Sequence, residues 1–177
     1  MLRENEFKIL VVGPFNSGKT TLIDTVCDGK IVKTEAPTYG LYKTVKEMTT
    51  VALDYGRFTL RSKKIHLFGT PGQERFSFMW HVLARGLDGF VMLIDGSDPQ
   101  SLLKAKRIYE LLASLYNVPH LIVVNNKNGR VLVRKEDVKK ILGTNAPIRE
   151  ASVLSLIHIS EPTRPRLISY AVFCLKK

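Results

Sequence analysis

Residues 13–20 of the chain read Gly13-Pro14-Phe15-Asn16-Ser17-Gly18-Lys19-Thr20. This stretch fits the pattern Gly-x-x-x-x-Gly-Lys-Thr of a phosphate-binding loop, whose glycines let backbone N–H groups approach phosphate oxygens. An apolar run over residues 7–12 precedes the loop, and a helical pattern over residues 19–27 follows it. This strand–loop–helix context is the one that the loop requires, because the helix N-terminus favours bound anions. The sequence therefore predicts a P-loop nucleotide-binding domain.

The residues of this loop carry the first functional expectations. Lys19 is expected to reach the β- and γ-phosphates and to assist catalysis, and Thr20 is expected to ligate Mg²⁺. The candidate nucleotide-binding residues of the loop and of the helix start are Gly13, Asn16, Ser17, Gly18, Lys19, Thr20 and Thr21.

Strands and helices alternate along residues 1–153, which predicts an α/β fold with a mostly parallel six-stranded sheet and helices on both faces. The expected strands are residues 7–12, 49–61, 64–68, 89–94, 120–124 and 147–151, and the expected helices are residues 19–27, 98–115 and 134–142. Residues 29–48 are polar and are expected to be irregular. Gly56 is expected to mark a bulge or bend in its strand.

Composition and charge narrow the function classes. The chain has 177 residues, which favours one domain, and its two cysteines are too few for a disulfide framework. It has no apolar run of membrane-spanning length and no signal core at the N-terminus, so we expect a cytoplasmic protein without an integral membrane segment. The net charge of +11 is scattered and accompanies no nucleic-acid motif. We therefore expect no nucleic-acid partner.

A second motif follows the expected strand over residues 64–68. The run Phe68-Gly69-Thr70-Pro71-Gly72-Gln73-Glu74-Arg75-Phe76 resembles the switch II motif of Ras-like GTPases, in which a strand ends in Asp-x-x-Gly-Gln. Gly69 stands at the aspartate position. Together with residues 49–57 and 78–80, the run resembles a prokaryotic branch that includes the gliding-motility GTPases and the small GTPases of actinobacterial regulatory gene clusters. The resemblance covers residues 7–152.

This resemblance implies a Ras-like P-loop fold and a Mg²⁺-dependent switch that binds and hydrolyses GTP, slowly without an activating partner. GTP or GDP with Mg²⁺ would be the cofactors, and a roadblock-type regulatory protein would be the partner. The N–H of Gly72 would sense the γ-phosphate, and Gln73 would orient the attacking water. The missing aspartate at Gly69 removes a support for Mg²⁺, so we expect a lowered magnesium affinity.

Switch I of such proteins needs a threonine that meets Mg²⁺ and the γ-phosphate. Thr50 is the main candidate for this metal-binding and catalytic role, because it lies 69 − 50 = 19 residues before Gly69, a spacing like that of Arf-type proteins. Thr49 and Thr38 are the alternatives.

Guanine is read in this superfamily by Asn-Lys-x-Asp after the fifth strand. The chain offers Asn125-Asn126-Lys127-Asn128, with an amide at the aspartate position, and the alternative register Asn126-Lys127-Asn128-Gly129 lacks the acid altogether. A carboxylate accepts both donors of the guanine edge, whereas an amide has one acceptor. Strict guanine selectivity therefore does not follow from this motif. Ser152, in Glu150-Ala151-Ser152, resembles the last base-contacting motif.

The departures at Gly69 and Asn128 leave two alternative functions open. One is a nucleotide-binding scaffold with little hydrolysis, and the other is an ATPase or phosphotransferase that uses the same loop. Single-turnover hydrolysis across several nucleoside triphosphates would separate them.

The end of the sequence differs in character from the rest. Residues 154–164 resemble the translation of a transposase-type sequencing adapter, and residues 168–177 resemble the flow-cell adapter that follows it. We therefore expect a P-loop domain over residues 1–153, truncated at its C-terminus, and a non-native tail over residues 154–177. Pro162 and Pro165 forbid one continuous helix there. The helix that closes a Ras-like fold is expected to be missing, with apolar sheet surface left exposed. The alternative is a genuine strand over residues 167–175.

Overall fold

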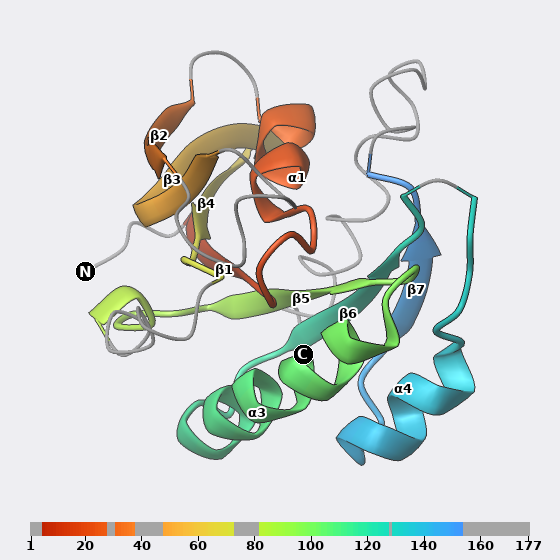
Figure 1. The fold of residues 1–177 in the computed structure, drawn as a ribbon. Helices are drawn as coiled ribbons and strands as arrows, with labels where there is room; N and C mark the ends of the chain where they lie inside the picture. Colours follow the sequence, from red (N-terminus) through yellow and green to blue (C-terminus); the bar gives the residue numbers. More distant parts are fainter. Residues whose placement is uncertain (1–4, 28–30, 38–47, 73–81, 128, 154–177) are drawn as a thin grey trace.

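The structure is a computed structural model that describes residues 5–27, 31–37, 48–72, 82–127 and 129–153. Its elements are β1 (Glu6–Val12), α1 (Lys19–Val26), β2 (Val32–Pro37), β3 (Met48–Leu60), β4 (Lys63–Gly69), β5 (Gly89–Asp95), α3 (Pro99–Leu115), β6 (His120–Asn125), α4 (Lys135–Leu142) and β7 (Ile148–Ala151) (Figure 1). Each strand and helix predicted from the sequence is present within a few residues of its expected bounds.

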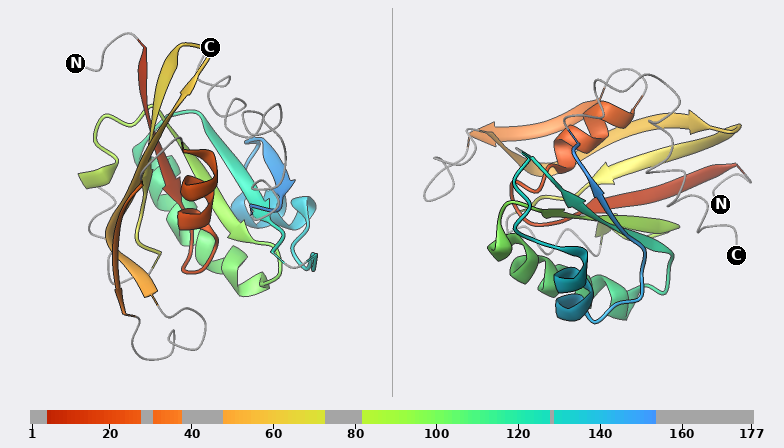
Figure 2. Two further views of the ribbon diagram at one scale, coloured as in Figure 1. Left: turned by 90° about the horizontal axis from the view of Figure 1, so that it is seen from above. Right: turned by 90° about the vertical axis from the view of Figure 1, so that its right-hand side faces the viewer.

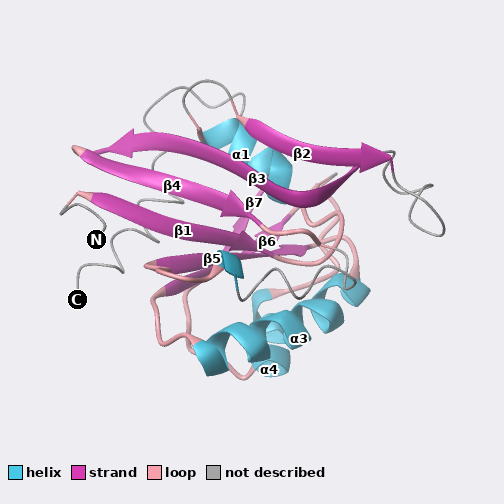
Figure 3. Ribbon diagram, turned by 90° about the vertical axis from the view of Figure 1, so that its left-hand side faces the viewer, coloured by secondary structure: helices cyan, strands magenta, loops and turns pink. Residues whose placement is uncertain are grey.

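The strands form one sheet in the order β2-β3-β4-β1-β5-β6-β7. Strand β1 runs parallel to both β4 and β5, and β5-β6 and β6-β7 are parallel pairs, whereas β3 is antiparallel to β2 and β4. The predicted α/β fold with a mostly parallel sheet is therefore confirmed. Figure 3 shows β1 and β4 pointing to the same edge of the sheet.

The predicted number of strands is wrong, because the described residues form seven strands and not six. The additional strand, β2, lies within residues 29–48, which were expected to be irregular. It pairs with β3 alone and occupies the edge of the sheet. An edge strand tolerates charged residues and proline, so its sequence lacks the apolar run by which the central strands were recognised.

Helices cover both faces of the sheet, as predicted. Helix α1 lies on one face, and α3 and α4 lie on the other (Figures 2 and 3). Alternate residues of β1 serve the two sides: Ile9 and Val11 pack in the cluster with α1, while Leu10 and Val12 pack in the cluster with α3 and α4. This alternation follows from the period of two residues along a strand. Because β1 is apolar on both faces, it forms the centre of the domain.

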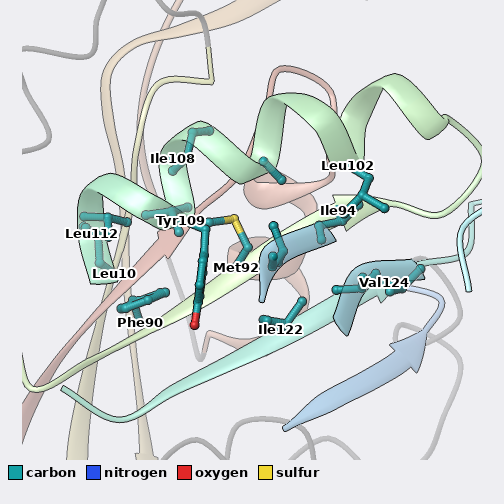
Figure 4. Close-up of a cluster of buried hydrophobic side chains, with 14 of the residues drawn as sticks. Leu10, Phe90, Met92, Ile94, Leu102, Ile108, Tyr109, Leu112, Ile122 and Val124 are labelled. Atoms are coloured by element: carbon teal, nitrogen blue, oxygen red, sulfur yellow. The ribbon is translucent and has the colours of Figure 1, made fainter. Parts of the chain in front are cut away.

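Helix α3 covers the larger of the two clusters (Figure 4). Asp98 caps its N-terminus by accepting a hydrogen bond from Gln100 N at 2.9 Å, and Pro99 occupies the first turn, where its missing N–H costs nothing. The buried apolar residues recur at helical spacing and are Leu102, Ala105, Ile108, Tyr109 and Leu112. The helix is therefore fixed at its start by a cap and along its length by an apolar stripe.

Two further expectations need correction. Gly56 is not a bulge, because it pairs in regular register with Leu67 of β4. It is a glycine because a Cβ there would collide with Cys27 Sγ under α1. The expectation that apolar sheet surface is left exposed is also wrong for the central strands, because β5 and residues 121–125 of β6 are buried. Residues 154–177 lie outside the described residues, so the tail and the missing closing helix stay predictions.

None of the helices in the described residues is long and apolar enough to cross a lipid bilayer.

Candidate nucleotide-binding site

The candidate site lies where the carboxyl ends of β1, β5 and β6 meet. After β1 the chain continues toward β2, β3 and β4 on one side, and after β4 it crosses to β5 and β6 on the other. Ligands of open α/β sheets bind at the carboxyl ends of the strands where the chain changes direction in this way. The P-loop follows β1 and occupies this position.

Two glycines shape the P-loop where neighbouring strands approach it. At Gly13, φ is +149° and a Cβ would collide with the carbonyl oxygen of Leu93. At Gly18, φ is +101° and a Cβ would collide with Asn125 Nδ2. Both positions therefore demand glycine for conformation and for space. Asn16, at φ +61°, is left-handed as well, a conformation that asparagine adopts more readily than most residues.

Lys19 begins α1 and is 7% exposed. Its ammonium donates to the carbonyl of Gly13 at 2.9 Å and to that of Pro14 at 2.7 Å, so the head group lies against the loop that precedes it. Ser17 is fully buried below this contact. The structure therefore places the candidate lysine and the turn of the loop together, as the motif predicts.

Thr20 is the next residue of the helix, and its hydroxyl donates to Asp54 Oδ2 at 2.7 Å. Asp54 comes from β3 and is 1% exposed. Thr21 follows and is half-buried. The candidate metal ligand of the P-loop thus has a carboxylate beside it, from the strand that the sequence analysis had connected with the site only through Thr49 and Thr50.

Gly72 lies directly against the P-loop. A Cβ at this position would be 2.6 Å from Lys19 Nζ and 2.7 Å from the Cα of Phe15. Thr70 precedes it and donates its N–H to the carbonyl of Val11 at 3.0 Å, which holds the segment beside β1. The structure therefore brings the expected phosphate-sensing glycine to the lysine of the loop. Gln73 lies outside the described residues.

Of the switch I candidates, Thr50 and Thr49 lie in β3, where their backbones pair with Glu35 and Ala36 of β2. The structure describes the backbone of this segment and not its side chains. Thr38 lies outside the described residues. The role of Thr50 therefore stays a prediction.

The segment after β6 contacts the P-loop through two of its side chains. Asn125 is 2% exposed, donates Nδ2 to the carbonyl of Ser17 at 3.0 Å and accepts from Val153 N at 3.1 Å. Lys127 donates to the carbonyl of Asn16. One amide thus ties the loop to the chain after β7, and one ammonium ties it to the turn after β6.

The remaining base-reading candidates lie close to these two residues. Asn126 donates its backbone N–H to the carbonyl of Ala151 at 2.8 Å, and a Cβ at Gly96 would lie 2.5 Å from its Oδ1. Ser152 lies between Ala151 and Val153, whose backbones make these bonds, and is half-buried. Asn128 lies outside the described residues. Two residues of this segment thus contact the P-loop. Asn125 is the asparagine of the register Asn125-Asn126-Lys127-Asn128, and Lys127 is the lysine of the alternative register Asn126-Lys127-Asn128-Gly129.

Comparison with known proteins identifies the family. The sequence matches the model of the ADP-ribosylation factor family over residues 1–166. The chain belongs to the ADP-ribosylation factor family. An uncharacterised protein of Methanocaldococcus jannaschii is 38% identical over 70% of this chain and 72% of its own length. ADP-ribosylation factor-like protein 8d of Arabidopsis thaliana is 26% identical over 92% of this chain and 87% of its own, and ADP-ribosylation factor-related protein 1 of Homo sapiens is 26% identical over 78% and 68%.

The family is one of small GTPases of the Ras superfamily, so this Arf-family chain is a small GTP-binding protein. The spacing between Thr50 and Gly69 and the gliding-motility branch both stay predictions. The family match extends across residues 154–166.

Two acidic residues at the site of this Arf-family chain were missed in the sequence. Asp54 and Asp95 lie within strands whose other residues are mostly apolar, and each ends up buried beside the P-loop or the turn after β6. An acid inside a buried strand costs free energy unless it is paired, so this pattern is the signal that could have revealed both.

Asp95 ends β5 and is 7% exposed. Burial alone would raise the pKa of its carboxyl, but hydrogen bonds from Lys127 Nζ, at 2.7 Å, and from the hydroxyl and N–H of Ser97 outweigh burial and lower that pKa below its ordinary value. Asp95 is thus a permanent anion near neutral pH that holds Lys127 over the P-loop.

Proposed function

We propose that this Arf-family protein is a Mg²⁺-dependent switch that binds GTP and hydrolyses it. The observation that carries the proposal is the contact between two candidate residues from distant parts of the sequence. Gly72 lies so close to Lys19 that a Cβ on Gly72 would be 2.6 Å from the ammonium. A γ-phosphate bound by Lys19 would therefore be near the N–H of Gly72, and its loss on hydrolysis would be felt by the segment that follows.

The roles proposed for the other residues follow from their positions. The N–H groups of Asn16, Ser17 and Gly18 would contact the phosphates at the start of α1. Thr20 would bind Mg²⁺, which would neutralise charge on the β- and γ-phosphates. Gln73 would orient the attacking water. Asn125 would hold the P-loop in place behind the nucleotide, because it bonds the carbonyl of Ser17.

The residues present fit a magnesium ion. Mg²⁺ prefers oxygen ligands and is bound in nucleotide sites through one or two protein groups together with substrate phosphates. Thr20 and Asp54 supply a hydroxyl and a carboxylate within 2.7 Å of each other. In the described residues, no cluster of three or more histidine, cysteine, aspartate or glutamate side chains forms a metal site. This fits a metal that enters with its nucleotide.

The deciding experiment measures nucleotide binding and single-turnover hydrolysis. Labelled GTP, GDP and ATP are titrated against the wild type, Lys19→Ala and the control Lys104→Ala, an exposed lysine of α3. We expect Lys19→Ala to abolish binding, because it removes the positive charge nearest the β- and γ-phosphates, and Lys104→Ala to bind like the wild type. Equal affinity of Lys19→Ala and the wild type would refute the hypothesis that residues 13–20 bind the nucleotide phosphates.

Hydrolysis distinguishes the switch from its alternatives. We expect Gln73→Leu to bind GTP like the wild type and to hydrolyse it more slowly. Equal turnover by both proteins would favour the scaffold function, and preferred turnover of ATP would favour the ATPase or phosphotransferase. A roadblock-type activator belongs to the same proposal, and it rests on the resemblance of residues 49–57, 68–76 and 78–80 alone. Acceleration of single-turnover hydrolysis by such a protein tests it.

The domain boundary is proposed at Val153, with residues 154–177 of separate origin. Val153 is buried and bonded to Asn125, so the compact domain reaches at least this residue. Resequencing of the source locus tests the boundary. An amphipathic helical sequence in place of residues 154–177 is expected, and a genomic read through these residues to a stop codon would contradict it.

A further inference from the structure

Asp54 is a buried carboxylate in contact with the residue expected to bind magnesium. Its Oδ2 accepts the hydroxyl proton of Thr20 at 2.7 Å, and the aspartate is 1% exposed. A carboxylate removed from water to this degree costs several kcal/mol unless charged or hydrogen-bonding groups compensate it. A role in packing alone does not explain an acid here, because an apolar residue of similar size would avoid this cost.

The position of Asp54 in the sheet relates it to Gly69. The two residues are directly paired in the antiparallel β3-β4 ladder, so their side-chain positions lie on the same face of the sheet. A Cβ on Gly69 would lie 3.2 Å from Asp54 Cβ and 3.4 Å from Asp54 Oδ2. The side chain of Asp54 therefore occupies the space that a side chain at position 69 would enter.

We propose that Asp54 supplies from β3 the carboxylate that Ras-like sequences carry at the position of Gly69, and that it positions Thr20 for Mg²⁺. The carboxylate would thus come from β3 instead of β4, and it still lies next to the P-loop residue Thr20. This inference rests on the proposed nucleotide-binding function. It replaces the expectation that Gly69 leaves the metal without carboxylate support.

The direction of the hydrogen bond explains how Asp54 acts. A threonine hydroxyl has one proton to donate and two lone pairs to offer. Because an ionised carboxylate can only accept, Asp54 takes the proton of Thr20 and leaves the lone pairs of that oxygen for a cation. Asp54 is therefore a positioning residue, and its negative charge close to the site also favours a divalent cation.

The presence of the carboxylate at Asp54 also explains why position 69 is a glycine. A Cβ there would lie 2.8 Å from Ile23 Cδ1 as well as close to Asp54, so aspartates at both positions would crowd α1 and place two like charges opposite each other. Removing the side chain at position 54 would relieve the second of these conflicts, and Ile23 could rotate to relieve the first. The two positions are therefore expected to be exchangeable.

The test measures the release rate of labelled GDP from the full chain while free Mg²⁺ is titrated. Bound Mg²⁺ slows release, so the midpoint of the titration reports magnesium affinity. We expect Asp54→Asn to move this midpoint to an Mg²⁺ concentration at least about tenfold higher, the usual effect of losing a group that orients a metal ligand. The control Asp24→Asn, an exposed acid of the same helix as Thr20, should keep the wild-type midpoint.

A second variant, in which the residues at positions 54 and 69 are exchanged, tests the inference if Asp54→Asn proves too unstable to purify. In Asp54→Gly, Gly69→Asp, the carboxylate returns to β4, and we expect a midpoint within about threefold of the wild type, whereas Asp54→Gly alone should resemble Asp54→Asn. A wild-type midpoint in Asp54→Asn or Asp54→Gly overturns the inference while leaving the nucleotide-binding function intact. A wild-type chain that binds no labelled GDP at any Mg²⁺ concentration overturns both.

Discussion

Lys127 Nζ lies 2.7 Å from Asp95 Oδ2, and the same ammonium donates to the carbonyl of Asn16 in the P-loop. The side chains of Lys127 and Asp95 are 19% and 10% exposed, so water screens their attraction only weakly. This ion pair joins the end of β5, the turn after β6 and the P-loop.

Removing the lysine should therefore destabilise the domain. We expect Lys127→Met to lower the free energy of unfolding by about 2–3 kcal/mol, because Asp95 is left as a buried carboxylate without its cation. Lys106→Met is the matched control, since Lys106 and Glu110 form an exposed pair at 3.8 Å on α3. Urea unfolding measures both. A loss in Lys127→Met no larger than that in Lys106→Met would show that the buried pair adds nothing.

Asp95 should also make stability depend on acid pH. Its folded-state pKa lies below the ordinary value of 3.8, so its stabilising contribution is present above that value and is lost as the pH falls through the folded-state pKa. We expect the free energy of unfolding to fall less steeply below about pH 4 in Asp95→Asn than in the wild type. Urea unfolding at a series of pH values gives the two curves, and parallel curves would contradict the assignment.

Gly18 and Gly143 are two of the glycines with positive φ, and they differ in their surroundings. Gly18 has φ +101° and no room for a Cβ beside Asn125, whereas Gly143, at φ +60° after α4, has nothing within 4 Å. Gly143→Ala should cost about 1 kcal/mol from backbone strain alone. Gly18→Ala should cost about 1–3 kcal/mol more, because the methyl group displaces Asn125. Thermal unfolding of both variants checks the difference, and equal losses would mean that the loop yields without cost.

Gly56 and Cys27 form a pair that a double-mutant cycle can measure. A Cβ on Gly56 collides with Cys27 Sγ and lies 3.0 Å from both Cys27 Cβ and Ile23 Cγ2. We expect Gly56→Ala to lose about 1–3 kcal/mol of stability through overpacking. Cys27→Ala should recover part of this loss in the double variant, since it removes the sulfur and leaves the two weaker contacts. Additive losses would show that the collision is relieved elsewhere.

Base selectivity can be tested in both registers of the motif after β6. If the first register is right, Asn128→Asp should raise the preference for GTP over ATP, because hydrogen bonds to a charged group contribute about 1.5–3 kcal/mol. If the second register is right, Gly129→Asp should do so instead. The ratio of the two dissociation constants is measured for each variant. An unchanged ratio in both would mean that other residues read the base.

The central part of the fold could be predicted from the sequence because its signals are local. Strand β5 is a continuous apolar run, α3 has a cap and an apolar stripe, and the P-loop has both of its glycines. Strand β2 escaped prediction because its pairing with β3 depends on a partner distant in the sequence and not on its own apolar residues.

The site residues that belong to one continuous motif could be predicted from the sequence. Those that are brought together by the pairing of separate strands could not. Lys19 and Gly72 were found because each lies in a recognisable run. Asp54 could not be connected with Thr20 until the β3-β4 register placed it opposite Gly69. Register is a long-range property, because a shift of one residue would have turned the same aspartate to the other face of the sheet.

The closeness of Gly72 to Phe15 and Lys19 affects how genetic data on this protein should be interpreted. Every other amino acid has a Cβ, and a Cβ at this position meets the backbone of Phe15 at 2.7 Å. Even alanine therefore overpacks this contact, and larger side chains add further collisions, so a saturation library should be depleted of substitutions at this codon. Such intolerance would arise from packing even in a chain that bound no nucleotide. A null phenotype at Gly72 therefore cannot by itself be taken as a sign of lost phosphate sensing.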